Sequence, residues 1–317
     1  MRLFRHFMIL VSAMTLMANT SFAGAGNSNV GTRAFNFLKI ETSARPTAMG
    51  GAFTGVASDA SALYYNPAGV ANLEGLNFIA GYHNNIFDMQ SGFLGYIFPM
   101  EEGKKISAYI NYLNYGDFIR TDNNGRELGT FSGSDMLFAA GYSMTLEDNI
   151  QIGGVAKFIY EKVESYSSTG AAIDLSAKWG LKNRMTNFGL MIQNLGTQLS
   201  GFTDNCKKNS IPTIVRGGIS TRLRGLPLLI AGDIVAPLDN DLYFCLGGEY
   251  LNLKPLFLRL GYTSFGQNYK THSNKDGLAG FSAGFGIEYH RLQISYAISP
   301  QAELGTSHRV TFTGGID

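Results

Sequence analysis

The side chains in this sequence with the clearest capacity for chemistry are charged residues that recur at alternate positions within apolar stretches. Between residues 171 and 180, Asp174 and Lys178 fall on one side of the chain, whereas Ile173 and Leu175 fall on the other. Extended strands produce this period of two, because successive side chains point to opposite faces. The sequence therefore predicts a charged inner face shared by several strands. Its predicted members are Lys157, Asp174, Lys178, Arg216, Asp233, Glu249, Arg259, Glu288 and Arg309.

Charges of opposite sign follow one another around this face, so side chains on neighbouring strands can form ion pairs. The simpler interpretation is structural, with the pairs holding the interior together. The alternative is that some of these charges bind a charged head group or line a path. Arg45 lies in a separate segment near the N-terminus, and we expect it to reach Asp233, Glu249 or Glu288.

Catalytic chemistry is not indicated by the remaining residues. The histidines are scattered and show no metal-binding spacing such as His-x₃-His. Gly50, Gly51 and Gly55 are not followed by the Gly-Lys-Ser/Thr of a phosphate-binding loop, so we expect them to serve close packing. The 25 Lys and Arg residues nearly balance 24 Asp and Glu, which gives no reason to expect a nucleic-acid partner. The sequence predicts a protein that is not an enzyme, holds no metal and uses no cofactor.

The elements that must position the charged face are strands. The pattern predicts fourteen of them, most long enough to cross a bilayer when tilted. The connections between them alternate in length: those at 116–134, 196–211 and 264–277 are long and polar, whereas those at the other end are tight. Short turns at one end and long loops at the other are typical of outer-membrane barrels. The predicted strands are 76–83, 92–99, 106–115, 135–144, 150–161, 171–180, 187–195, 212–221, 227–236, 242–251, 256–263, 278–288, 291–299 and 307–313.

We therefore expect an all-β protein in which residues 75–317 form a transmembrane, antiparallel, up-and-down β-barrel. Residues 24–74 are predicted to form an N-terminal hatch, or plug, inside its lumen. The stretch 44–74 is rich in Ala and Gly, and a short helix is predicted around 60–65. We expect Gly50 and Gly51 to allow close packing and Arg45 and Asp59 to anchor the hatch. The turn at its end is predicted to be shaped by Asn66, Pro67 and Ala68.

The first 23 residues have the features of a signal peptide. A charged start with Arg2 and Arg5 precedes an apolar core of about a dozen residues and a small-residue cleavage site ending at Ala23. Export permits a disulfide between Cys206 and Cys245, but the simpler interpretation is that both are unpaired. Together with the strands, the signal peptide predicts the outer membrane, with the N- and C-termini in the periplasm.

The N-terminal stretch also resembles the signature of the PorV/PorQ-type outer-membrane proteins, a group related to the FadL-type long-chain fatty-acid transporters. The motifs that carry the resemblance are Ala48-Met49-Gly50-Gly51-Ala52-Phe53, Ala57-Ser58-Asp59-Ala60-Ser61-Ala62-Leu63-Tyr64 and Asn66-Pro67-Ala68-Gly69, followed later by Gln193-Asn194-Leu195-Gly196. The resemblance implies a fourteen-stranded barrel blocked by a hatch with an Asn-Pro-Ala turn. It also implies that a hydrophobic small molecule, similar to a long-chain fatty acid, binds from outside and passes when the hatch shifts.

The partners implied in this way are outer-membrane lipids and that hydrophobic ligand. The same group includes components of type IX protein secretion. The alternative function is therefore a barrel that docks secreted cargo or partner proteins of the secretion system at the outer membrane.

Overall fold

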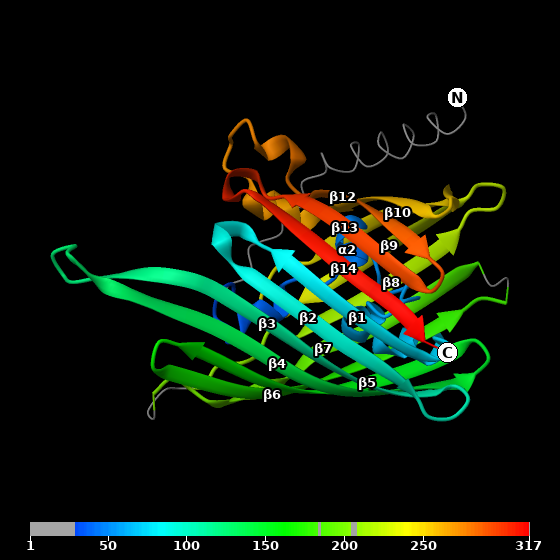
Figure 1. Cartoon of the computed structure of the whole chain (residues 1–317), viewed down its shortest axis with the longest axis horizontal. Helices are drawn as coiled ribbons and strands as arrows, with labels where there is room; N and C mark the ends of the chain where they lie inside the picture. The colour runs from blue at the N-terminus through cyan, green and yellow to red at the C-terminus, as the bar shows by residue number, and fades with distance from the viewer. Residues whose placement is uncertain (1–28, 183–184, 204–207, 317) are drawn as a thin grey trace.

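The computed structural model describes residues 29–182, 185–203 and 208–316. The predicted signal peptide and Cys206 lie outside the described residues. Within them the chain forms fourteen strands, each antiparallel to the next, and β1 pairs with β14 to close a barrel (Figure 1). This confirms the predicted fold and strand number. The strands are β1 Leu76–Asn84, β2 Gln90–Pro99, β3 Lys104–Thr121, β4 Glu127–Glu147, β5 Ile150–Val163, β6 Tyr166–Gly180, β7 Thr186–Ser200, β8 Ile214–Arg222, β9 Leu228–Pro237, β10 Tyr243–Leu253, β11 Leu256–Thr263, β12 Phe281–Tyr289, β13 Leu292–Pro300 and β14 Thr306–Ile316.

The barrel is apolar on its outer face. In β2, Leu94 and Tyr96 point outward and are exposed, whereas Phe93 and Ile97 point inward and are buried. The same alternation places Ile110 of β3 beside Leu94 on the outside. Strands of a closed sheet have no free edge, so the outer surface is set by these side chains alone. No helix in the described part of the chain is long and apolar enough to cross a membrane.

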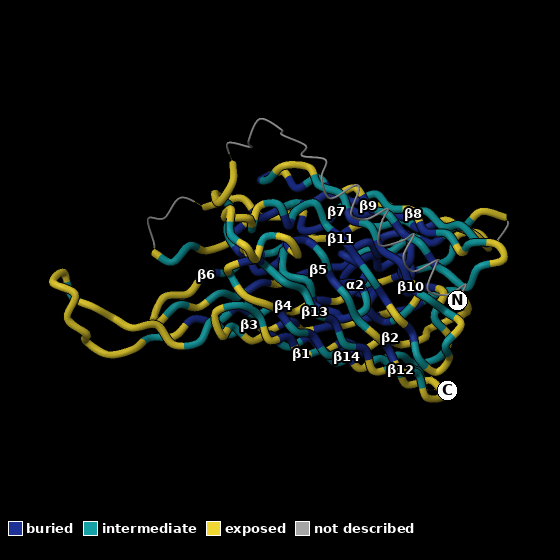
Figure 2. The backbone as a smooth tube through the Cα atoms, turned by 90° about the horizontal axis from the view of Figure 1, so that it is seen from above, coloured by how far each residue is buried: buried dark blue, intermediate teal, exposed yellow. Residues whose placement is uncertain are grey.

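One predicted loop proved to be strand. The connection expected at 116–134 is instead the continuation of β3 and β4, which pair as far as Thr121 and Glu127. Their tight turn is closed by hydrogen bonds from Asp122 N to Arg126 O (2.9 Å) and from Gly125 N to Asp122 O (3.0 Å). The extension projects beyond the barrel as an exposed hairpin (Figures 1 and 2). Its polar, glycine-containing sequence was misread because a hairpin that is solvated on both faces needs no apolar alternation.

The connections sort into two ends. The turn end carries the β2–β3, β4–β5, β6–β7, β8–β9, β10–β11 and β12–β13 turns together with the C-terminal end of β14. The loop end carries the remaining connections, of which β5–β6 is a two-residue turn rather than a loop. The short helices at the loop end are η3 Ile86–Asp88, η4 Ser264–Tyr269, η5 Asp276–Leu278 and η6 Ala302–Leu304.

Residues 29–74, here called the N-terminal segment, begin at the loop end, where Ala34 N donates to Ser210 O (3.1 Å), and then run through the inside of the barrel. From Thr42 to Ala71 every residue is buried except Arg45, Ser58 and Asp59. Side chains of the segment and of the wall share one apolar cluster, in which Phe53 and Leu63 pack with wall residues such as Ile79, Ile97 and Leu137. The helix predicted at 60–65 is present but begins later. The helices of the segment are η1 Asn36–Lys39, α2 Ala44–Ala48, α3 Ala62–Tyr65 and η2 Pro67–Asn72.

Candidate functional site

The wall of the barrel carries glycine where the N-terminal segment touches it. A Cβ added to Gly189 would lie 2.1 Å from the carbonyl oxygen of Thr54, and one added to Gly261 would lie 1.9 Å from the amide nitrogen of Gly50. No real Cβ approaches other atoms so closely, so these positions require glycine. Glycine at inward strand positions is the sequence signal for this contact surface, and the alternation of apolar and charged residues does not reveal it. The other wall glycines that meet the segment are Gly81, Gly95, Gly153, Gly170, Gly218, Gly247 and Gly284.

Wall hydroxyl groups bind the backbone of the segment. Its helices are short, so many of its amide and carbonyl groups have no partner within the segment and need one elsewhere. Ser143 Oγ donates to Pro67 O (2.7 Å), and Ser220 Oγ donates to Gly55 O (2.9 Å). In the opposite sense, the amide of Gly50 donates to Ser282 Oγ (3.1 Å). The segment is therefore held by the barrel more than by its own secondary structure.

Four of the predicted inner-face charges also bind this backbone. Asp233 accepts hydrogen bonds from the amides of Phe53 (3.1 Å) and Thr54 (2.9 Å). Lys178 Nζ donates to the carbonyl oxygens of Val56 (2.8 Å) and Ala57 (2.7 Å). Two arginines donate to single carbonyl groups, Arg216 to Gly51 (3.3 Å) and Arg309 to Glu41 (3.2 Å).

The remaining inner-face charges pair with one another, except Glu288. Lys157 on β5 pairs with Asp174 on β6 (2.6 Å), and Arg259 on β11 pairs with Glu249 on β10 (2.6 Å). Glu288 is half-buried and contacts no cation at ion-pair distance among the described residues. Ion pairs between strands thus involve only four of the nine charged residues predicted for the inner face.

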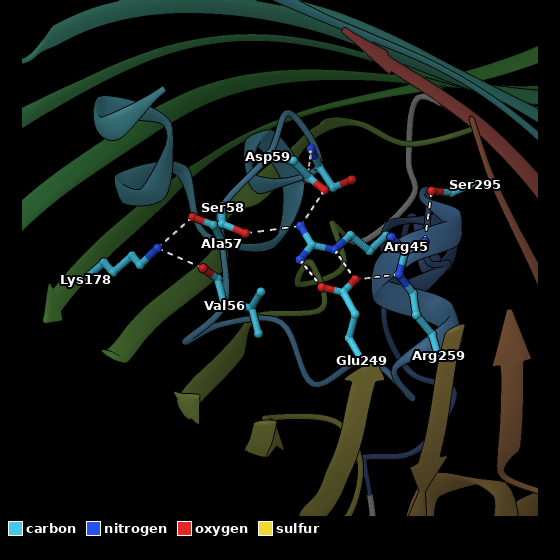
Figure 3. A network of polar contacts seen from close by, with 10 residues as sticks. Arg45, Val56, Ala57, Ser58, Asp59, Lys178, Glu249, Arg259 and Ser295 are labelled. Atoms are coloured by element: carbon cyan, nitrogen blue, oxygen red, sulfur yellow. Dashed lines mark hydrogen bonds and ion pairs between the residues drawn. The ribbon is translucent and has the colours of Figure 1, made fainter. Parts of the chain in front are cut away.

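Arg45 on α2 forms the most extensive polar contacts of the segment (Figure 3). Its Nε and Nη2 donate to the two carboxylate oxygens of Glu249 (2.8 and 2.7 Å), and its Nη1 donates to Asp59 (2.8 Å) and Ser58 (3.1 Å). Burial opposes the charged form of Arg45, but the carboxylates of Glu249 and Asp59 outweigh it and hold the pKa of Arg45 above its usual range. Of the three carboxylates expected for Arg45, it binds Glu249 and neither Asp233 nor Glu288.

The predicted turn residues lie where the chain changes direction. Gly50 (φ +66°) and Gly51 (φ +83°) adopt the left-handed conformation that glycine tolerates best. Asn66 accepts a hydrogen bond from the amide of Ala68 (3.2 Å) and donates one to Thr54 O (2.7 Å). Pro67 begins η2, where its missing N–H removes no helical hydrogen bond. These contacts fix the segment's shape.

A cavity of about 340 Å³, here called the loop-side cavity, lies between the N-terminal segment and the loop end. Arg216 and Arg309 line it, are more than nine-tenths buried, and have no carboxylate at ion-pair distance among the described residues. Arg216 Nε also has no hydrogen-bond partner among the described residues. Glu41 lines the same cavity at greater than ion-pair distance, and Lys39 pairs with Asp239. The apolar lining includes Ile40, Ile86, Met89, Ile214, Phe265 and Phe281.

A second cavity of about 650 Å³, here called the turn-side cavity, opens on the opposite side of the segment. It is the more charged of the two, with eight Lys, Arg, Asp and Glu side chains in its lining against four in the loop-side cavity. The eight are Arg45, Asp59, Glu74, Arg222, Glu249, Lys254, Glu288 and Arg291. Neither cavity holds a metal-binding cluster, since the described residues contain no group of three His, Cys, Asp or Glu side chains arranged to bind an ion.

These features define a class of protein: a closed fourteen-stranded barrel with its N-terminal segment bound inside. Residues 10–113 match the sequence model of an uncharacterised protein family, UPF0164. No curated protein matches the chain in sequence.

The fold is shared, at low sequence identity, with the solved structures of toluene transporters and of a FadL homologue. The toluene transporter TodX of P. putida is 13% identical with a TM-score of 0.63, covering 86% of this chain and 98% of its own. The toluene transporter TbuX of Ralstonia pickettii is 13% identical with a TM-score of 0.62, covering 90% and 100%. A FadL homologue from Pseudomonas aeruginosa is 12% identical with a TM-score of 0.50, covering 86% and 97%. The chain thus shares its fold with these proteins, whereas the expected relation to FadL-type transporters and the narrower PorV/PorQ resemblance stay predictions.

Proposed function

We propose that this protein is an outer-membrane transport protein that binds and passes a hydrophobic small molecule of the long-chain fatty-acid kind. The observation that carries this proposal is the loop-side cavity. Two buried guanidinium groups, Arg216 and Arg309, lie beside an apolar lining and have no carboxylate at ion-pair distance among the described residues, although Glu41 lines the same cavity farther away. A buried charge is costly unless it is paired, so a bound anion would stabilise both groups. A ligand with an acidic head and an apolar body satisfies both parts of the lining.

The remaining architecture suits this role. The apolar outer face fits a membrane, and by the usual orientation the turn end, which carries the C-terminal end of β14, lies in the periplasm. The described N-terminal segment begins at the loop end, where Ala34 N donates to Ser210 O and Lys39 pairs with Asp239. The N-terminal segment then lies below the loop-side cavity and acts as the hatch. TodX and TbuX are described as toluene transporters, and toluene is a neutral hydrocarbon. The two arginines are the reason to propose an acidic ligand for this chain instead.

Binding of radiolabelled oleate to the purified protein tests the proposal, with toluene as the neutral comparison. We expect oleate to bind, and the Arg216→Gln/Arg309→Gln double variant to bind it at least about tenfold more weakly, the factor expected when a charge-assisted hydrogen bond is lost. Arg120→Gln is the matched control, because Arg120 lies on the exposed hairpin and pairs with Glu164 of the β5–β6 turn, so the change should leave binding unchanged. Equal oleate binding by the double variant would contradict the proposal.

Native mass spectrometry of protein extracted gently from its own membrane distinguishes the alternative. A fatty-acid adduct released on denaturation supports transport. A protein partner at fixed stoichiometry, without a lipid adduct, would favour docking in type IX secretion. The projecting β3–β4 hairpin, with exposed Ile119 and Leu128, is the feature that would suit such a partner.

A further inference from the structure

The two cavities lie on opposite sides of one short stretch of chain. The loop-side cavity touches Thr47 and Gly50, and the turn-side cavity touches Arg45. Both cavities are lined by β8 and by β10 to β14, with Cys245 and Glu249 of β10 facing the first and second cavity respectively. Residues 44–51 therefore form a partition between two spaces that run along one side of the barrel wall.

Helix α2, the first part of this partition, has little apolar packing. Ala44 and Ala48 of α2 form a small separate cluster with Ala297 of β13. By contrast, residues such as Phe53 and Leu63 belong to the large cluster that joins the segment to the rest of the wall. Apolar stabilisation scales with buried area, so three alanine side chains hold α2 weakly. Met49, directly after α2, belongs to the large cluster and is the apolar anchor of the partition. The glycines opposite it, Gly247, Gly261 and Gly284, present no side chains that would resist sliding.

Polar contacts hold the partition in place, and they can be exchanged. Glu249 accepts hydrogen bonds from Arg45 and from Arg259, so it stays paired if Arg45 leaves. Glu288 lines the turn-side cavity with Arg45 and has no cation at ion-pair distance among the described residues. The carboxylate of Glu288 is thus available to pair with the guanidinium group of Arg45 after that group leaves Glu249 and Asp59.

The loop-side cavity is connected to the partition through β14. Arg309, which lines that cavity, donates to the carbonyl oxygen of Glu41 (3.2 Å), three residues before α2. Two residues further along β14, Thr311 Oγ1 accepts from the amide of Ala44 (2.9 Å). An anion bound by Arg309 would compete with the Glu41 carbonyl and loosen the chain that leads into α2.

We propose that residues 44–51 are a local gate, that ligand passes along the β10–β14 wall, and that Arg45 moves from Glu249 and Asp59 to Glu288 when the gate opens. This inference rests on the proposed transport function. It differs from movement of the whole segment, because residues 52–72 stay fixed to the wall.

Disulfide locks test the gate. In a background with Cys206→Ser and Cys245→Ser, Ala48→Cys/Ala297→Cys joins α2 to β13 within one contact cluster. The control Leu63→Cys/Gly95→Cys joins the fixed part of the segment to β2, where a Cβ on Gly95 would lie 2.6 Å from Leu63 Cδ1. Uptake of radiolabelled oleate by cells is measured in oxidised and reduced states, and oleate binding is measured on the purified proteins.

We expect oxidation of the α2 lock to reduce uptake to background and reduction to restore it, with oleate binding retained throughout. The control lock should leave uptake unchanged. Loss of uptake with both locks would overturn the local gate in favour of whole-segment movement, and full uptake with both would place the route elsewhere. If the unlocked protein takes up no oleate, the proposed function fails, and the gate fails with it.

The exchange of partners is tested by Glu288→Gln. This change should slow uptake by about tenfold, the effect of losing one charge-assisted hydrogen bond, without weakening oleate binding. Glu74→Gln is the matched control, because Glu74 lines the same cavity but pairs with the exposed Arg291. Equal uptake by the two variants would overturn the role of Glu288.

Discussion

At the scale of single residues, the interior is governed by charges that bind backbone as often as they bind one another. Asp233 and Lys178 each satisfy two backbone groups of the N-terminal segment. A buried ion pair is weak evidence for stability, because desolvation offsets its attraction, but the loss of one partner is costly. The inner-face charges therefore matter most where their removal would leave another buried group unpaired.

Arg45→Ala should loosen the N-terminal segment without unfolding the barrel. Leaving a buried charge without its partner costs about 3–5 kcal/mol, and we expect the lower end because Glu249 keeps Arg259. Faster amide hydrogen exchange across residues 44–51 and a raised conductance in planar bilayers should follow.

Arg120→Ala is the matched control for Arg45→Ala. It removes the exposed ion pair between Arg120 and Glu164, which is worth at most about 1 kcal/mol. It should therefore change neither the hydrogen exchange of residues 44–51 nor the conductance. An unchanged conductance of the Arg45→Ala protein would show that Arg45 does not hold the segment in place.

At the scale of elements, the backbone of the N-terminal segment packs directly against the barrel wall at positions where the wall carries glycine and therefore no side chain. Glycine at inward positions brings the two backbones together, and the neighbouring serines and Asp233 then complete the hydrogen bonds. Both features are properties of the wall, so the segment's position is encoded largely in the strands that surround it.

Gly189→Val should prevent the N-terminal segment from packing against the barrel wall while leaving the barrel assembled. Its side chain would collide with the backbone of Thr54, and overpacking of this kind costs about 1–3 kcal/mol or more. We expect a conductive pore from a protein that still shows the heat-dependent electrophoretic shift of a folded barrel. Gly217→Val is the control, because a Cβ there meets no atom within 4 Å. A closed pore in the Gly189→Val variant would show that glycine at this position is not needed for the N-terminal segment to bind the wall.

The strands were predictable because their signal is local. Alternation within eight or so residues indicated the strands and eight of the charges that are buried inside, but it missed Lys105 of β3 and Asp135 of β4, which are also buried at inward positions. The β3–β4 extension was missed because it is solvated on both faces and lacks that alternation. The choice of Glu249 for Arg45 depended on how the segment lies against β10, a three-dimensional relation that spacing along the chain does not contain.

At the scale of the whole molecule, the barrel reverses the usual distribution of polarity. Charged side chains such as Lys157, Asp174 and Arg259 are buried inside, whereas large apolar side chains such as Leu94, Ile110 and Phe138 are exposed outside. Water cannot stabilise that outer surface, but lipid can. The projecting hairpin of β3 and β4 continues past this apolar surface, so one strand, β3, carries isoleucines in two different surroundings, Ile110 on the barrel and Ile119 on the hairpin.

The two isoleucines provide a direct test of the membrane-spanning arrangement. Arginine on the lipid-facing surface of a barrel costs about 2–4 kcal/mol near the bilayer midplane and close to nothing outside it. Ile110→Arg should therefore lower the free energy of unfolding from phospholipid vesicles by about that amount, whereas Ile119→Arg should leave it unchanged. The unfolding can be followed by fluorescence, because Trp179 is the only tryptophan and stacks on Phe188 at the outer surface. Equal effects of the two substitutions would contradict a bilayer around the β3 portion of the barrel.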